Sequence, residues 1–251
     1  FNGLTARFNS FTIPAIVAVI IYKQPTTRRT PRHMVLEVYS LEFTPHTTAI
    51  RSLCMENGIE ITLVPTNPRE GACKTPEYLK MNPMHAIPVL KDGDFTMWES
   101  KSILRYIANK HNLEAWYPTD PQKRAHVDLA LDFCNNNFQN VIGPKVVYPI
   151  VGIVSPLSEA EAAEVEKQWK EDVMPSFEHI LRRSGGPLFG GSRPNIADLA
   201  FLGHLVTVFG KAPDSFVCKT EAISSYFAAV KAALPKYADA FGPSEAFFSA
   251  K

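Results

Sequence analysis

The sequence predicts a small α/β domain followed by an all-α domain. Short segments with alternating apolar residues open the first part, and a segment with helical spacing separates two of them. Long amphipathic segments without strand patterns fill the second part. The chain has 251 residues, of which 45% are hydrophobic and 20% charged. It can therefore bury a substantial core, which excludes a globally disordered protein.

The first elements form a strand, a helix and a strand. Residues 35–39 alternate between apolar and polar positions and predict a strand. Residues 47–57 carry apolar side chains at helical spacing and stop at Gly58, a favourable helix terminator. Residues 59–64 alternate again. Three such elements within about thirty residues indicate a βαβ unit.

The next elements form a short helix, a hairpin and a longer helix. Residues 76–81 are expected to be the short helix. The apolar runs 86–90 and 95–98 flank an Asp-Gly pair, which is the strongest short signal for a β-hairpin. A further helix is expected over residues 99–111.

The second part predicts helices only. The pairs Ser158/Glu161 and Asn195/Asp198 have the spacing of helix N-terminal capping boxes. We place one domain at residues 34–113, a linker at 114–121 and an all-helical domain at 122–251. The helices are expected at residues 123–140, 158–183, 195–209 and 221–234.

Residues 1–33 differ from the rest of the chain, because they contain five basic residues and no acidic residue. Their apolar run, residues 13–21, is shorter than the ~20 residues that span a bilayer, so no integral membrane span is expected. Three interpretations stay open: a targeting segment, an artefact of cloning or of translation upstream of Met34, and a structured extension.

Charge and cysteine content narrow the classes of function. The formal net charge is +1, which argues against a protein that mainly binds nucleic acid or an anionic membrane. The four cysteines are far apart, so neither a zinc site nor a disulfide framework is expected. A reducing, cytoplasmic location fits this pattern, with organelle targeting by residues 1–33 as the alternative.

Three segments carry a resemblance to a known family. Residues 82–90 (NPMHAIPVL), 98–107 (WESKSILRYI) and 196–200 (IADLA) resemble, in order and spacing, motifs of the cytosolic glutathione transferases, specifically the serine-type classes theta, phi, delta and epsilon. The resemblance implies a thioredoxin-like first domain, glutathione as co-substrate, no metal and a homodimer. It also implies that the helical domain contributes the site for the electrophile.

The resemblance assigns Ile87 and Pro88 to main-chain binding of glutathione. Family members hold the corresponding X-Pro bond cis, which turns the backbone of Ile87 outward to pair with the cysteinyl backbone of the tripeptide. That mode is strand addition. From the residues alone, a trans edge-strand proline stays open as the alternative.

Further residues would bind the two ends of glutathione. Ser100 and the free N–H groups at its helix start would hold the γ-glutamyl carboxylate, with Glu99 opposite the amine. Lys74 and His85 match positions that bind the glycine carboxylate in other members, although Cys73 departs from the pattern. The alternative for Glu99 is that its negative charge only stabilises the helix dipole. The alternative for Lys74 and His85 is that both are ordinary solvated side chains.

Thr44 stands where the resemblance implies the catalytic hydroxyl. A thiol has a pKa of ~8.5, so the enzyme must stabilise the thiolate, and a hydroxyl donor at a helix start would do so. The alternative is that Thr44 only caps the helix, with Thr47 and Thr48 as neighbouring hydroxyls. A cysteine at Thr44 would imply omega-like thiol transfer, and there is none.

The electrophile site is the least defined by the sequence. Phe133, Asn136 and Phe138 are the candidates on helix 123–140, with burial of the two phenylalanines in the core as the alternative. The function expected is conjugation of glutathione to hydrophobic electrophiles in detoxification, or reduction of organic peroxides. A non-catalytic binding or scaffold module is the main alternative, and a dehalogenase or isomerase is a third.

Overall fold

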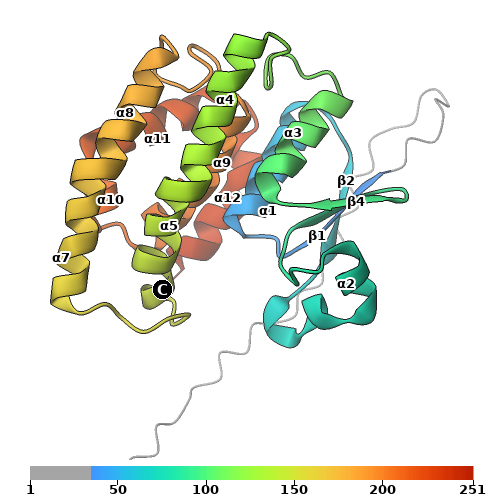
Figure 1. Cartoon of the computed structure of the whole chain (residues 1–251), viewed down its shortest axis with the longest axis horizontal. Coiled ribbons are helices and arrows are strands. Elements are labelled where there is room, and N and C mark those ends of the chain that lie inside the picture. Colours follow the sequence, from blue (N-terminus) through green and yellow to red (C-terminus); the bar gives the residue numbers. More distant parts are fainter. Residues whose placement is uncertain (1–34, 251) are drawn as a thin grey trace, which may run out of the picture. The chain divides into compact units, whose positions relative to one another are not determined.

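A four-stranded mixed sheet organises the first part of the computed structural model, which describes residues 35–250. The strands β1 (Leu36–Ser40), β2 (Ile61–Pro65), β3 (Val89–Asp92) and β4 (Phe95–Trp98) lie in the order β2-β1-β3-β4. Three of them, β1, β2 and β4, are labelled in Figure 1. β1 and β2 are parallel, whereas β3 is antiparallel to both β1 and β4. The predicted βαβ unit, the hairpin and the thioredoxin-like class are confirmed.

Three helices accompany the sheet: α1 (Pro45–Glu56), α2 (Pro76–Met81) and α3 (Ser100–Lys110). Each of the first two starts at a threonine whose hydroxyl accepts a main-chain N–H, followed by a proline at the first helical position. Helix α3 has no side-chain cap. Two short 3₁₀ turns, Pro68–Glu70 and Ala72–Lys74, precede α2.

The predicted strand at residues 86–90 begins only at Val89. Pro88 has no N–H to donate to a strand partner, which explains the later start. The predicted extension at residues 1–33 lies outside the described residues.

The second part is helical, as predicted, and contains three helices that the sequence patterns did not indicate: α6 (Tyr148–Ile150), α10 (Phe216–Lys219) and α12 (Tyr237–Ser249). Three stretches, Cys134–Phe138, Ile142–Val147 and Trp169–Val173, are π-helical. Pro144 lies within the second stretch, and its missing N–H interrupts the regular ladder of helical hydrogen bonds. None of the described helices is both long and apolar enough to cross a membrane. The α-helices are α4 (Pro121–Phe133), α5 (Gln139–Val141), α6 (Tyr148–Ile150), α7 (Glu159–Gln168), α8 (Met174–Arg183), α9 (Ile196–Lys211), α10 (Phe216–Lys219), α11 (Glu221–Ala233) and α12 (Tyr237–Ser249).

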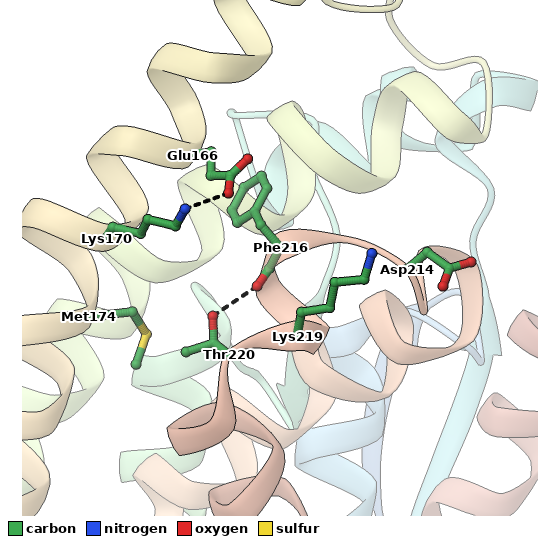
Figure 2. Close-up of a pocket in the computed structure, with 7 residues that line it drawn as sticks. All are labelled: Glu166, Lys170, Met174, Asp214, Phe216, Lys219 and Thr220. Atoms are coloured by element: carbon green, nitrogen blue, oxygen red, sulfur yellow. Dashed lines mark hydrogen bonds and ion pairs between the residues drawn. The ribbon is translucent and has the colours of Figure 1, made fainter.

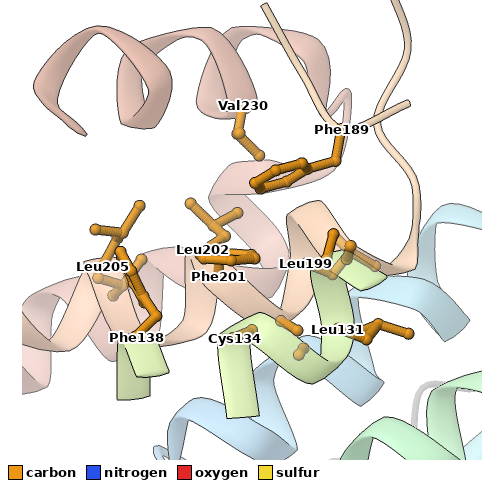
Figure 3. Close-up of a cluster of buried hydrophobic side chains, with 14 of the residues drawn as sticks. Leu131, Cys134, Phe138, Phe189, Leu199, Phe201, Leu202, Leu205 and Val230 are labelled. Atoms are coloured by element: carbon orange, nitrogen blue, oxygen red, sulfur yellow. The ribbon is translucent and has the colours of Figure 1, made fainter. Parts of the chain in front are cut away.

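Helix α9 is the centre of the core. It is buried from Ile196 to Val208 and packs against α1, α4, α11 and α12 (Figures 1 and 3). At Gly203, an added Cβ would lie 2.2 Å from the main-chain oxygen of Pro45. Glycine at this position therefore lets α9 approach the start of α1, next to the predicted site.

The start of α9 is held by Asp198. Its carboxylate accepts N–H groups of Asn195 at 2.8 Å, Phe189 at 2.9 Å and Gly190 at 3.3 Å, and the hydroxyl of Tyr226 at 2.8 Å. Burial nevertheless raises the pKa of Asp198 to about 6. The predicted capping box at Asn195 is confirmed, as is the one at Ser158.

Candidate functional site

Three hydroxyls form a row between the end of β1 and the start of α1. The hydroxyl oxygens of Thr44 and Thr47 are 2.7 Å apart, and Thr47 donates to the hydroxyl of buried Ser40 at 2.6 Å. The Thr44 oxygen also accepts the main-chain N–H of Thr47 at 3.2 Å. Thr44 is thus the N-cap of α1, and it is partly exposed to solvent.

The number of protons in this row decides which way each bond points. Each threonine has one hydroxyl proton. Because Thr47 gives its proton to Ser40, the proton between Thr44 and Thr47 comes from Thr44. In this arrangement the proton of Thr44 points at Thr47, and Thr44 must turn it away from Thr47 to donate to a thiolate.

The loop before β3 presents Ile87 beyond the end of strand pairing. The β1–β3 register ends at Tyr39–Val89, and the Ile87–Pro88 bond is cis. The preceding carbonyl, of Ala86, is held by the hydroxyl of Tyr78 at 2.7 Å and by the side-chain amide of Asn82 at 2.8 Å. The loop conformation is therefore fixed by side chains of α2 and its C-terminus.

Glu99 and Ser100 form the turn from β4 into α3. Glu99 is exposed and has φ = 69°, a left-handed conformation that is uncommon for a residue with a side chain. Ser100 is buried, and its hydroxyl oxygen lies 3.2 Å from Nδ1 of His46 in the first turn of α1. This contact ties the start of α3 to the start of α1.

His46 is a residue that the sequence patterns missed. Its only local signal is its place after Pro45, which is typical of an ordinary first helical turn. Its partner lies 54 positions away in the chain, so no periodicity could indicate the pair.

Lys74 and His85 flank α2, and both side chains are exposed. His85 has φ = 45°. In the part of the chain that the structure describes, neither side chain forms a hydrogen bond or ion pair, so both charged or polar ends are free to meet a ligand. Cys73, next to Lys74, is only 1% exposed and packs with Tyr78 and Val89.

The structure brings several of the predicted residues together. Thr44 and Ser100 are linked through the first turn of α1, because His46 follows Thr44 by two residues. Ile87 lies two residues before Val89, which pairs with the end of β1. The chain connects β1 to Thr44 in four residues. Thr44, Ile87 and Ser100 therefore gather around the end of β1 and the start of α1.

The predicted electrophile residues are not gathered in a cleft. Phe138 is fully buried, and its ring centroid lies within 6.0 Å of those of Trp169, Phe177 and Phe201. Figure 3 shows Phe138 and Phe201 within the buried cluster. The interpretation of Phe138 as a cleft wall is therefore corrected to a core residue, because burying its ring in an aromatic cluster stabilises the fold.

Phe133 also packs on the core, since it is 9% exposed and stacks on Phe201 at 6.3 Å. Asn136, in contrast, is exposed on the π-helical stretch, and its carbonyl accepts the side-chain amide of Asn140 at 2.8 Å. Of the three predicted electrophile contacts, only Asn136 has an exposed side chain.

A pocket of about 510 Å³ lies in the helical region, away from these residues (Figure 2). Of its four charged side chains, Glu166 and Lys170 pair with each other at 2.7 Å, and Thr220 donates to the carbonyl of Phe216 at 2.8 Å. It contains none of the predicted site residues. Among residues 35–250, no group of three or more His, Cys, Asp or Glu side chains is arranged to hold a metal ion. The pocket is lined by Glu166, Lys170, Met174, Asp214, Phe216, Lys219 and Thr220.

The chain is similar to known proteins. Residues 34–109 match the family model described as glutathione S-transferase, N-terminal domain. Glutathione S-transferase theta-2 of Homo sapiens is 30% identical over 182 residues, which cover 69% of this chain and 71% of that protein. Glutathione S-transferase 1 of Manduca sexta is 38% identical over 102 residues, 40% of this chain.

Other relatives are covered less completely. The matching segment spans 47% of the Manduca sexta protein and 30% of glutathione S-transferase T2 of Arabidopsis thaliana.

Solved structures show the same fold. A delta-class glutathione transferase of Nilaparvata lugens superimposes with a TM-score of 0.70 at 25% identity, over 85% of this chain and 96% of that one. The human theta-class enzyme, in complex with the glutathione conjugate of 1-menaphthyl sulfate, superimposes with a TM-score of 0.69 at 24% identity, over 86% and 88%. On the match to the theta-2 protein and the shared fold, this chain belongs to the glutathione S-transferase family.

Proposed function

We propose that this chain binds glutathione and transfers its thiolate to hydrophobic electrophiles. The observation that carries the proposal is the start of α3. This helix has no side-chain cap, and the hydroxyl of Ser100 lies at its first position, so its N–H groups and that hydroxyl form a suitable site for the γ-glutamyl carboxylate. The exposed carboxylate of Glu99 would face the γ-glutamyl amine.

The rest of the tripeptide would follow the loop before β3. Ile87 lies beyond the last β1–β3 pair, and in this proposal its main chain would add the cysteinyl backbone as a further strand, with Pro88 next to it. The glycine carboxylate would meet the exposed side chains of Lys74 and His85.

Thr44 would then stabilise the thiolate. Lowering a thiol pKa by one unit requires ~1.4 kcal/mol of preference for the ionised form. A hydrogen bond to a charged group contributes ~1.5–3 kcal/mol, against ~0.5–1.5 kcal/mol for a neutral one. The thiolate is therefore the better partner for the proton of Thr44 than Thr47 is, and binding would turn that proton toward sulfur.

Ser100→Ala tests the proposal. The variant should fold like the parent and bind glutathione at least about ten-fold more weakly, since one charge-assisted hydrogen bond is lost. Ser102→Ala, two residues along the same helix, is the matched control. Calorimetric titration with glutathione and a urea unfolding curve on each variant separate binding from stability. An unchanged dissociation constant together with a lower unfolding midpoint would show that Ser100 stabilises the start of α3 and does not bind glutathione.

A second candidate function is a non-catalytic glutathione-binding module. It is favoured by the row of hydroxyls, in which the proton of Thr44 is already given to Thr47. A glutathione-affinity column followed by a spectrophotometric assay with a chloronitroaromatic electrophile and an organic peroxide separates the candidates. Retention on the column without turnover of either substrate would favour the binding module.

We also propose the domain boundaries 34–113, 114–121 and 122–251, a cytoplasmic location and a role in detoxification. A homodimer is proposed through the helices that start near Trp98 and Lys123. Phe95, Trp98 and Leu129 expose large apolar side chains in this region, which fits a surface that a second copy of the chain would cover.

A further inference from the structure

Three basic side chains meet where α1, α3 and α9 pack together. The rings of His46 and His204 lie edge to face with centroids 5.2 Å apart. Lys101 and His204 are each only 6% exposed. Lys101 donates to the side-chain carbonyl of Gln139 at 2.5 Å, and in residues 35–250 none of the three side chains forms an ion pair.

The cluster keeps both histidines neutral. Burial and, to a smaller extent, the nearby charge of Lys101 lower the pKa of His46 to about 3. Burial, Lys101 and His46 together hold the pKa of His204 well below its ordinary value. A neutral imidazole has one N–H donor and one acceptor nitrogen, so Nδ1 of His46 can either accept a hydrogen bond from the Ser100 hydroxyl or donate one to it.

These two arrangements differ in what Ser100 can offer a ligand. If Ser100 donates its single proton to Nδ1 of His46, the hydroxyl has none left for a carboxylate. If Nδ1 of His46 carries the proton and donates to the Ser100 oxygen, the hydroxyl proton of Ser100 is free. A ligand carboxylate therefore selects the second arrangement.

We propose that His46 is a positioning residue for glutathione: its Nδ1–H donates to the oxygen of Ser100 and directs the hydroxyl proton of Ser100 to the ligand carboxylate. This inference rests on the proposed function of Ser100. The two bonds strengthen each other, because a hydroxyl that donates to a carboxylate becomes a better acceptor for His46.

Neighbouring groups favour this role for His46. His204 touches His46 through its ring, but its own Nε2 has no hydrogen-bond partner in the described structure, so it does not compete for Ser100. Lys101 is tied to Gln139 and is likewise not bonded to Ser100. Within the cluster, only His46 lies at hydrogen-bonding distance from Ser100.

A double-mutant cycle on the full chain tests the proposal. The dissociation constant for glutathione is measured by calorimetry for the wild type, His46→Leu, Ser100→Ala and the double variant. His46→Leu should weaken binding about three- to ten-fold in the wild type, the range of one neutral hydrogen bond, and less than two-fold when Ser100 is already alanine. His46→Asn, whose amide N–H can occupy the place of Nδ1–H, should restore most of the affinity.

Two further measurements keep the test decisive. His204→Phe removes the imidazole beside His46 but no bond to Ser100, so it should leave the dissociation constant within two-fold. Nitrogen NMR of the wild type should show the proton of His46 on Nδ1 in the glutathione complex. Either equal effects of His46→Leu in both backgrounds or a proton on Nε2 in the complex would overturn the role of His46. A wild type that does not bind glutathione would instead overturn the proposed function itself.

Discussion

Thr47→Val should lower the pKa of the glutathione thiol in the complex, although Thr47 is not expected to touch the ligand. Valine keeps the shape of threonine and removes the hydroxyl that receives the proton of Thr44 at 2.7 Å. The main-chain N–H of residue 47 still holds the Thr44 oxygen at 3.2 Å. The proton of Thr44 then has no partner within the row and is free for the thiolate.

The size of the fall in the thiol pKa follows from the Thr44–Thr47 hydrogen bond, which the variant no longer has to break. A neutral hydrogen bond contributes ~0.5–1.5 kcal/mol net, and one pKa unit corresponds to ~1.4 kcal/mol. The thiol pKa should therefore fall by about 0.4–1 unit relative to the wild-type complex. Stability should fall as well, by about 1–3 kcal/mol, because the fully buried hydroxyl of Ser40 loses its donor.

Titration of the thiolate absorbance in the glutathione complex measures the pKa, and urea unfolding measures stability. Thr47→Ser keeps the hydroxyl and should match the wild type in both. Thr44→Val should raise the thiol pKa toward its free value, whereas Thr44→Ser should not. If Thr47→Val raised the pKa as much as Thr44→Val, Thr47 would belong to the donor group and the proton count would be refuted.

Three other predictions follow from the fold. Gly203→Ala should lower the free energy of unfolding in urea by at least about 1–3 kcal/mol, because its Cβ would lie 2.2 Å from the oxygen of Pro45, whereas Gly242→Ala, which meets nothing within 4 Å, should not. The pKa of Asp198 is raised by burial to about 6, so its stabilising contribution is largest when it is protonated and is lost as the pH rises. The unfolding free energy of the wild type minus that of Asp198→Asn should therefore fall by about 2 kcal/mol between pH 4 and pH 7, and a rise would contradict the raised pKa. Sedimentation at micromolar concentration should give the mass of two chains, and a monomer would exclude the proposed homodimer.

The sequence alone determined most of the local order of helices and strands, although not α6, α10 and α12. Alternation predicted β1 and β2, the Asp-Gly pair predicted the β3–β4 hairpin, and the capping boxes at Ser158 and Asn195 predicted two helix starts. These signals involve residues a few positions apart, whose geometry the backbone sets without help from distant parts of the chain. The resemblance added the proposed roles of Ile87 and Ser100 because their motifs are also short, and it added the role of Thr44 from its position before the first helix.

The tertiary structure decided what depends on distant partners. Phe138 has the same spacing whether it lines a cleft or fills the core, and only its packing against Trp169 and Phe201 places it in the core. The pairing of His46 with Ser100 joins residues 54 positions apart, so no periodic pattern contains it. The direction of the proton on Thr44 likewise depends on the buried hydroxyl of Ser40, which the fold brings to Thr47. Short-range patterns specify backbone conformation, whereas these side-chain contacts form only when the sheet and α9 pack against α1 in the folded protein.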